Sequence, residues 1–228
     1  MKINSISDIG VKRAENQDNY WSALLNIDGS EVGIVCLCDG MGGLNNGRLA
    51  SKIVVESVRD AVKDGIPFSG LESVLVQVNK TIYELGVKEE GMMGTTCTLL
   101  QCSNGKYEVF HVGDSRCYRV NQSGMTAITT DHSAIVKLGL DKDKDYALWR
   151  KYKNSLTRCI GYKNDVMVDY ISGDYMFGDC FLVCSDGMWH YFDDYVVKYE
   201  DIFDLPSIIH KCIESGETDN ITGSILSI

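Results

Sequence analysis

The sequence predicts an α+β fold built mainly from antiparallel sheets, and two observations carry this prediction. Short apolar segments with strand character follow one another closely, and hairpin-like separators such as Ser103-Asn104-Gly105 and Gln122-Ser123-Gly124 join some of them. Segments with helical periodicity are grouped between these series instead of alternating with single strands. Short connections favour antiparallel pairing, and helices are needed to cover an apolar sheet face.

The first half of the chain is expected to form three strands and then two helices. The strands are expected at residues 2–9, 19–25 and 33–38. A turn at Asp28-Gly29-Ser30 separates the second strand from the third. Apolar residues then recur at helical spacing over 49–62 and stop at Asp64-Gly65, and a cleaner amphipathic helix is predicted at 71–85. Both apolar helix faces are expected to cover a sheet.

The second half of the chain is expected to contain mostly strands. These are predicted at residues 95–102, 106–112, 116–120, 125–129, 167–171, 180–184 and 221–228. Residues 133–153 lose strand character, and we expect one or two short helices with loops there. A third helix is predicted at 205–215, with Ile208, Ile209 and Cys212 facing inward.

Four aspartates lie at the edges of predicted strands. Asp39, Asp114 and Asp186 each come shortly after an apolar run, and Asp219 precedes the last one. A strand end fixes a carboxylate in space, and a neighbouring glycine such as Gly40 lets a backbone carbonyl or a ligand approach closely. Several converging carboxylates repel one another unless cations neutralise them. The pattern therefore predicts a cluster of hard divalent ions, Mg²⁺ or Mn²⁺.

Such a cluster indicates phosphoryl chemistry. Two divalent ions about 3.5–4 Å apart can activate a water molecule and clamp both oxygens of an in-line displacement at phosphorus. Arg13, shortly before Asn16-Gln17-Asp18, offers a bidentate fork for a phosphate. Taken singly, each signal has an ordinary explanation, because an Asp-Gly pair is most often a turn and a loop arginine is usually solvated.

Composition excludes several other classes of protein. The formal net charge of −10 and the lack of a basic patch argue against nucleic-acid binding. There is no uninterrupted apolar run of about 18 residues and no signal-peptide pattern, so we expect a cytoplasmic protein that does not span a membrane. The nine cysteines are odd in number and scattered, and they are expected to be reduced packing residues. The mixed charges over residues 141–153 are typical of a solvated surface.

The order of the motifs resembles the PPM (PP2C-type) family of metal-dependent serine/threonine protein phosphatases, in its compact bacterial form. The matching motifs are Gly10 to Asp18, Asp39-Gly40-Met41-Gly42-Gly43, Gly94-Thr95-Thr96, Gly113-Asp114-Ser115-Arg116, Thr130-Asp131-His132-Ser133, Leu156-Thr157-Arg158, Ser185-Asp186-Gly187 and Asp219-Asn220-Ile221-Thr222. The resemblance implies an α-β-β-α sandwich of two antiparallel sheets flanked by helices. It also implies one catalytic domain over residues 1–228, with a flap at about 133–155.

The resemblance further implies how the carboxylates share two metal ions, and that the ions lie in a cleft at one end of the sandwich. Asp39 would bridge the two ions, and the Gly40 carbonyl would bind the first of them. Asp186 and Asp219 would hold the second ion. The nucleophile would be a hydroxide that bridges both ions, and no covalent phosphoenzyme would form.

Three further residues and the partners of the chain follow from the same resemblance. Asp18 would act through metal-bound water, Arg13 would bind the substrate phosphate, and Asp114 would help to form a third metal site. Phosphoserine and phosphothreonine proteins would be the substrates, and a bacterial-type Ser/Thr kinase would oppose the enzyme. We expect a monomer.

The chain departs from the family pattern where a proton donor is expected. Met41 stands where many animal members carry a histidine, and Leu44 and Arg48 replace a histidine and a glutamate of many bacterial members. Metal-bound water is then the default donor, with His132 as a candidate that a structural histidine would also explain. Gln17 stands where some relatives use glutamate, so the second metal would have one carboxylate fewer.

Two alternatives to a protein phosphatase remain open from the sequence. A catalytically silent binding module would keep the fold and recognise a phosphoprotein or a kinase, although such proteins usually lose metal carboxylates that this chain retains. A small-molecule phosphatase or nucleotidase would use the same site and differ only in its substrate.

Overall fold

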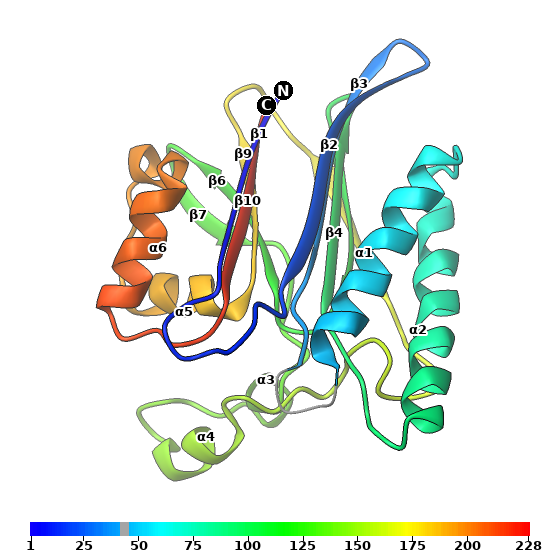
Figure 1. The fold of residues 1–228 in the computed structure, drawn as a ribbon. Coiled ribbons are helices and arrows are strands. Elements are labelled where there is room, and N and C mark those ends of the chain that lie inside the picture. The colour runs from blue at the N-terminus through cyan, green and yellow to red at the C-terminus, as the bar shows by residue number, and fades with distance from the viewer. Residues whose placement is uncertain (42–45) are drawn as a thin grey trace.

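The computed structural model describes residues 1–41 and 46–228 and contains two stacked five-stranded sheets (Figure 1). The first sheet has the strand order β1-β10-β9-β6-β7, and the second has the order β2-β3-β4-β5-β8. Every strand pair in the described residues is antiparallel. The strands are β1 Lys2–Asp8, β2 Asn19–Ile27, β3 Ser30–Cys38, β4 Cys97–Ser103, β5 Lys106–Val112, β6 Arg116–Asn121, β7 Gly124–Ala127, β8 Asp169–Asp174, β9 Cys180–Cys184 and β10 Ile221–Ser227.

Helices cover the outer face of each sheet, so the expected α-β-β-α sandwich is confirmed (Figure 1). A pair of long helices packs on the second sheet and a pair of shorter ones packs on the first, with 3-10 turns at Phe68–Gly70 and Tyr199–Phe203. The helices are α1 Gly47–Lys63, α2 Leu71–Lys88, α3 Ala134–Leu138, α4 Tyr146–Tyr152, α5 Asp186–Asp194 and α6 Leu205–Glu214. In the described residues, no helix combines the length and the apolar character that a bilayer span requires.

Three apolar layers hold the sandwich together. One layer lies between α1, α2 and the second sheet, a second lies between the first sheet and α5 with α6, and a third lies between the sheets. The central layer joins strands of both sheets through side chains such as Leu37, Phe181 and Leu226, which are all fully buried. Burial of this kind contributes roughly 1.5–3 kcal/mol per large side chain. The strand ends are therefore held in fixed positions.

The helix α5 was not predicted from the sequence. No element was expected between the strand at 180–184 and the helix at 205–215, but Asp186 is the first residue of a nine-residue helix. A carboxylate in the first turn of a helix interacts favourably with its free N–H groups. The helix is short and its apolar side chains Met188 and Phe192 are buried against the first sheet, so its stability comes from tertiary packing.

The cysteine prediction is confirmed, because all nine cysteines are free and buried. Residues 133–153 contain the two short helices α3 and α4, as expected, and these lie at one end of the sandwich (Figure 1). Smaller differences concern strand bounds: β4 begins two residues later than predicted, β7 ends at Ala127 and β8 begins at Asp169.

Candidate active site

Asp39 is held by an extension of the ladder between β3 and β4. Its backbone N–H donates to the Thr96 hydroxyl at 2.9 Å, and the Thr96 N–H donates to the Asp39 carbonyl at 2.9 Å. The next residue has to be glycine, because a Cβ on Gly40 would lie 2.4 Å from the carbonyl oxygen of Gly47 and 2.7 Å from that of Gln17. The chain therefore delivers the Asp39 carboxyl group at a fixed point just beyond the sheet.

Asp18 reaches the same point from the loop that follows β1. It is 6% exposed, and its Oδ2 accepts a hydrogen bond from the Ser185 hydroxyl at 2.8 Å. Ser185 immediately precedes Asp186 at the start of α5. A carboxylate from the N-terminal loop is thus tied directly to the segment that presents another aspartate.

Asn220 fastens this loop to the last strand. Its side-chain amide donates to the carbonyls of Ile9 and Glu15 at 2.8 and 3.1 Å and accepts from the Gln17 N–H at 2.9 Å. Asn220 stands in the Asp219-Asn220 motif, but the sequence alone indicated no role for it. Its three hydrogen bonds to backbone groups make it a positioning residue for Asp18 and Asp219.

The structure brings the predicted carboxylates together in one acidic cluster. The negative charges of Asp18, Asp186, Asp114 and Asp219 all act on Asp39 and raise its pKa. Burial raises the pKa of Asp39 well above its ordinary value and raises that of Asp18 to about 7. Burial likewise raises the pKa of Asp114 to about 8 and increases that of Asp186. Ionising this cluster in the absence of a cation therefore costs free energy.

Two buried oxygens in the cluster are suited to hard cations. Oδ1 of Asp18 and Oδ1 of Asp186 are buried and have no hydrogen-bond partner among the described residues. A buried carboxylate oxygen without a partner is costly unless something neutralises it. Oxygen donors select Mg²⁺ or Mn²⁺ over soft metals, so the residues fit the divalent ions that the sequence predicts.

Arg13 forms an ion pair with Asp219, which the sequence analysis did not predict. The side chains are 41% and 29% exposed, and the hydrogen bond to Asp219 raises the pKa of Arg13. The residue expected to bind phosphate and a residue expected to bind a metal therefore contact each other. The pair is solvent-exposed enough to open at small cost.

A second network ties Asp114 to the end of α5 and to the base of the 133–153 segment. Arg116 forks onto Asp131 with hydrogen bonds of 2.9 and 2.8 Å and donates to Asp193 at 2.7 Å. Its guanidinium lies 3.6 Å from the ring centre of Trp189, whose indole N–H donates to the Asp114 carbonyl at 2.7 Å. The motif Gly113-Asp114-Ser115-Arg116 named this arginine, but its partners are distant in sequence.

The residues discussed as proton donors have other contacts. The two ring nitrogens of His132 contact the Gly113 N–H and Asp169 at 3.0 Å each, and burial lowers the pKa of His132. These contacts favour the structural alternative for His132. Arg48 is exposed and lies 3.8 Å from Glu15. Leu44 lies outside the described residues, as do the glycines at 42 and 43.

His190 lies close enough to the cluster for Asp186 and Asp114 to act on its charge, and no sequence motif indicated it. Its Nδ1 lies 2.9 Å from Glu217. Burial raises the pKa of Glu217, but the bond to His190 and the backbone N–H groups of Asp219 and Thr218 together lower it to about 2. Burial opposes the charge on His190, but Glu217 and the nearby Asp186 raise its pKa overall. Its place in α5, one turn after Asp186, follows from a helix that the sequence did not predict.

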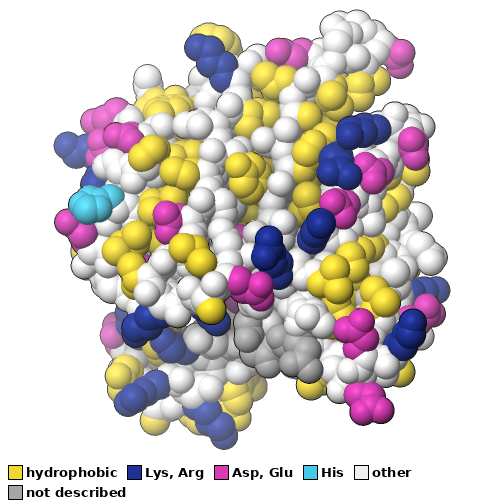
Figure 2. All heavy atoms as spheres, viewed as in Figure 1, with side chains coloured by type: hydrophobic (Ala, Val, Ile, Leu, Met, Phe, Trp, Pro, Cys, Tyr) yellow, Lys and Arg dark blue, Asp and Glu magenta, His cyan; other side chains and the backbone are white. Residues whose placement is uncertain are grey.

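A cavity of about 530 Å³ opens between the acidic cluster and the segment with α3 and α4. It is bordered by Asp114, Trp189 and His190 on one side and by Lys142 and Trp149 on the other. Figure 2 shows Lys and Arg side chains gathered over the segment that carries α3 and α4 in Figure 1. The candidate site therefore has a wall that supplies aromatic rings and positive charge beside the carboxylates.

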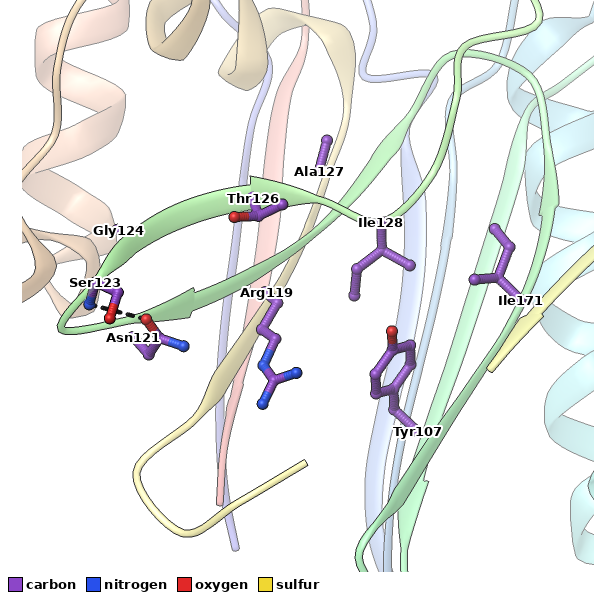
Figure 3. A pocket seen from close by; sticks show the side chains of 9 residues that line it. All are labelled: Tyr107, Arg119, Asn121, Ser123, Gly124, Thr126, Ala127, Ile128 and Ile171. Carbon is purple, nitrogen blue, oxygen red and sulfur yellow. Dashed lines mark hydrogen bonds between the residues drawn. The ribbon is translucent and has the colours of Figure 1, made fainter. Parts of the chain in front are cut away.

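A second cavity, of about 490 Å³, lies away from the carboxylates, where Arg119, Tyr107 and Ile128 face one another (Figure 3). Its lining extends along β6 to Asn121, whereas Asp114 precedes the other end of that strand. Six residues of a strand span about 20 Å. None of the predicted site residues lines this cavity.

Comparisons with known proteins give this fold and site a class. Residues 11–219 match the family model described as protein phosphatase 2C. Protein phosphatase PhpP of Streptococcus pneumoniae is 28% identical, with 100% of this chain and 98% of the relative covered. A putative protein phosphatase 2C-type of Streptococcus pyogenes is 31% identical over 97% of this chain and 95% of its own length. The solved structure of the serine/threonine phosphatase Stp1 from Staphylococcus aureus matches with a TM-score of 0.84 at 25% identity, covering 100% of this chain and 94% of that one.

The fold, the site and these matches place the chain among the protein phosphatases. More narrowly, the chain belongs to the protein phosphatase 2C (PPM) family, and it is a phosphatase enzyme. Enzymes of this family depend on divalent metal ions, generally Mn²⁺ or Mg²⁺.

Proposed function

We propose that this chain hydrolyses phosphoserine and phosphothreonine in proteins by direct attack of a water-derived nucleophile at a centre of two Mn²⁺ or Mg²⁺ ions. The convergence of Asp39, Asp18 and Asp186, together with two buried oxygens that have no partner among the described residues, carries the proposal. The names of two similar proteins support phosphoserine and phosphothreonine as substrates. The proteins from Listeria innocua and Staphylococcus aureus are both called serine/threonine phosphatases.

The chain's own groups would divide the work of holding the ions. Asp39 and the Gly40 carbonyl would bind the first ion, and Asp186 and Asp219 would bind the second. Asp39 would also be a ligand of the second ion. Asp18 would contribute through water. When bound, such ions act as Lewis acids that lower the pKa of a water molecule and neutralise charge at the phosphoryl group.

The remaining groups would handle the substrate. Arg13 would exchange its contact with Asp219 for the substrate phosphate, which offers a stronger bidentate partner for a guanidinium. Asp114, held through the backbone by Trp189, would help to hold a third ion. We propose that residues 133–155 act as a flap beside the site in one catalytic domain spanning 1–228, and that the basic side chains of the flap contact phosphoprotein substrates.

The proposed partners follow from this substrate class. Phosphoproteins would be the substrates, a bacterial-type Ser/Thr kinase would supply them, and the enzyme would act as a monomer in the cytoplasm. The steady supply of phosphorylated serine or threonine requires a kinase reaction of that class.

The decisive experiment measures hydrolysis of a phosphothreonine peptide with Mn²⁺, with EDTA, and with Asp39→Asn. Because Asp39 would touch both ions, we expect EDTA to abolish the activity and Asp39→Asn to lower kcat/KM by roughly 100-fold or more. Asp64→Asn, an exposed change at the end of α1, is the matched control and should leave the rate unchanged.

The same assay separates the alternatives. Faster turnover of free nucleotides than of phosphopeptides would favour a small-molecule phosphatase. A protein that binds no Mn²⁺ by calorimetry and hydrolyses nothing would be a binding module. Activity that survives both chelation and Asp39→Asn would falsify the two-metal mechanism.

A further inference from the structure

Three of the nine buried cysteines form a cluster of their own behind the acidic site. Cys36 and Cys38 point to the same face of β3, because side chains two apart on a strand share a face. The pairing of Leu37 with Thr98, together with the bond from the Thr96 N–H to the Asp39 carbonyl, puts Cys97 of β4 opposite Cys38. All three side chains are fully buried in the layer under α1 and α2.

The sulfur atoms of this triad lie close together. The Sγ atoms of Cys36, Cys38 and Cys97 are all within 4.8 Å of one another. In the part of the chain that the structure describes, no other group of three or more Cys, His, Asp or Glu side chains has its ligand atoms so close. Among the described residues, ligand atoms within 4.8 Å of one another are thus found in this triad and not in the acidic cluster.

The triad also differs from the other buried cysteines in its contacts. Cys180 and Cys212 reach a tyrosine hydroxyl and a backbone carbonyl at 3.8 and 3.9 Å. The triad thiols influence one another: Cys38 and Cys97 lower the pKa of Cys36, whereas burial and Cys36 raise the pKa values of Cys38 and Cys97. The case for a metal site therefore depends on the positions of the three sulfur atoms.

The spacing matches the needs of a metal bound by three sulfurs. A metal–sulfur bond of about 2.3 Å in a trigonal arrangement puts the sulfur atoms roughly 4 Å apart, which lies within the observed limit. Thiolates select soft ions such as Cu(I) and Zn(II) and disfavour Mn²⁺ and Mg²⁺. The chemistry of the triad is therefore complementary to that of the carboxylates.

We propose that Cys36, Cys38 and Cys97 bind one soft, thiophilic d¹⁰ cation, Cu(I) or Zn(II), at a site separate from the acidic centre. In this step metal–sulfur bonds replace S–H bonds and the protons leave to solvent, with no change in oxidation state. Since the triad is closed to solvent, the ion enters when the chain folds or when the end of the β3–β4 ladder opens locally.

The test uses the whole protein, reduced, stripped with EDTA, and held in excess Mn²⁺ so that the carboxylates are occupied. Cd²⁺ is the spectroscopic probe, and the thiolate-to-cadmium absorption band is followed during titration. Metal content is also measured on protein produced in cultures supplemented with zinc or copper. We expect one equivalent of Cd²⁺ with a thiolate band, displacement by Cu(I), competition from excess Zn²⁺, and a rise in Tm on loading.

Variants assign the site to the triad. Cys97→Ala and Cys36→Ala should each lose the band and the rise in Tm, whereas Cys117→Ala, a fully buried cysteine outside the triad, should keep both. If the alanine variants fail to fold, the ¹¹³Cd NMR shift of the wild-type protein still reports how many sulfurs bind the ion. The proposal is overturned by the absence of a thiolate band after both titration and culture, by fewer than three sulfur ligands, or by undiminished binding in a folded Cys97→Ala protein. None of these readouts depends on phosphatase activity, so failure here would leave the proposed function standing.

Discussion

Metal-free protein should lose stability as the pH rises through neutrality. Burial raises the pKa of Asp18 from 3.8 to about 7, despite hydrogen bonds from Ser185 and Thr222. Between these values the folded protein holds a proton that the unfolded chain has released, so raising the pH favours unfolding. A shift of about 3 units corresponds to a stability loss on the order of 4 kcal/mol, of which about 3 kcal/mol falls between pH 5 and pH 8.

Urea denaturation of EDTA-treated protein at pH 5 and pH 8 measures this loss. Asp18→Asn removes the titrating group while keeping an acceptor for the Ser185 hydroxyl. In this variant, the difference in free energy of unfolding between pH 5 and pH 8 should be smaller than in the wild-type protein by on the order of 3 kcal/mol. Asp64→Asn, which changes an exposed carboxylate, should behave like the wild-type protein. Saturating Mn²⁺ should abolish most of the difference, because a bound cation favours the ionised carboxylates.

Two results would refute this reasoning. If the metal-free wild-type protein is equally stable at both pH values, burial does not oppose ionisation of the carboxylates. A pH dependence unchanged by Asp18→Asn would assign the effect to other groups in the cluster, of which Asp39 and Asp114 have pKa values raised in the same direction.

Three further substitutions test the groups around the cluster. Arg116→Ala should lower the free energy of unfolding, measured by chemical denaturation, by about 3 kcal/mol, because it leaves Asp131, only 9% exposed, without its partner. Arg59→Ala is the control and should cause little change, because Arg59 is 33% exposed and pairs with a carboxylate that is 57% exposed. His132→Gln should lower Tm, because two contacts of the ring are lost, while leaving the pH profile of kcat unchanged. If the variant instead loses the rise or the fall of kcat with pH, His132 is a proton donor. Asn220→Ala should weaken Mn²⁺ binding and cost about 1–3 kcal/mol, since three backbone groups lose their partner; unaltered Mn²⁺ affinity by calorimetry would show that the loop holds its place without Asn220.

The strands were predictable because their pattern is local. β5 and β9 begin and end at the predicted residues, since each is a short apolar run with turn residues on both sides. The helix α5 was missed for the opposite reason. Its first two residues, Asp186-Gly187, form a pair that is most often a turn, and the nine-residue helix is stabilised by tertiary contacts, among them those with α6 and β10.

The acidic cluster was predictable as a set of residues but not as a set of contacts. Strand ends indicated Asp39, Asp114, Asp186 and Asp219, whereas the position of Asp18 depends on a hydrogen bond across 167 positions of sequence. The amide of Asn220 reaches the Gln17 N–H across 203 positions. No local pattern encodes such pairings, so neither the packing of the N-terminal loop nor the pairing of Arg13 with Asp219 could be anticipated.

The contact between Arg13 and Asp219 predicts opposite effects on metal and substrate. In this structure Arg13 supplies the positive charge beside Asp219, and a metal ion at Asp219 would compete for the same carboxylate. Arg13→Ala removes the competitor, so Mn²⁺ affinity measured by calorimetry should stay the same or rise. The same change removes the phosphate fork, so KM for a phosphopeptide should rise and kcat/KM should fall.

Arg13→Lys sharpens this test because it keeps the charge and loses the planar fork. Its Mn²⁺ affinity should match that of the wild-type protein, while its KM should lie between those of the wild type and Arg13→Ala. An unchanged KM in both variants would rule out phosphate binding by Arg13. A loss of Mn²⁺ affinity in Arg13→Ala would show instead that the ion pair holds Asp219 in place for the metal, and Arg13 would then be a positioning residue for the acidic centre.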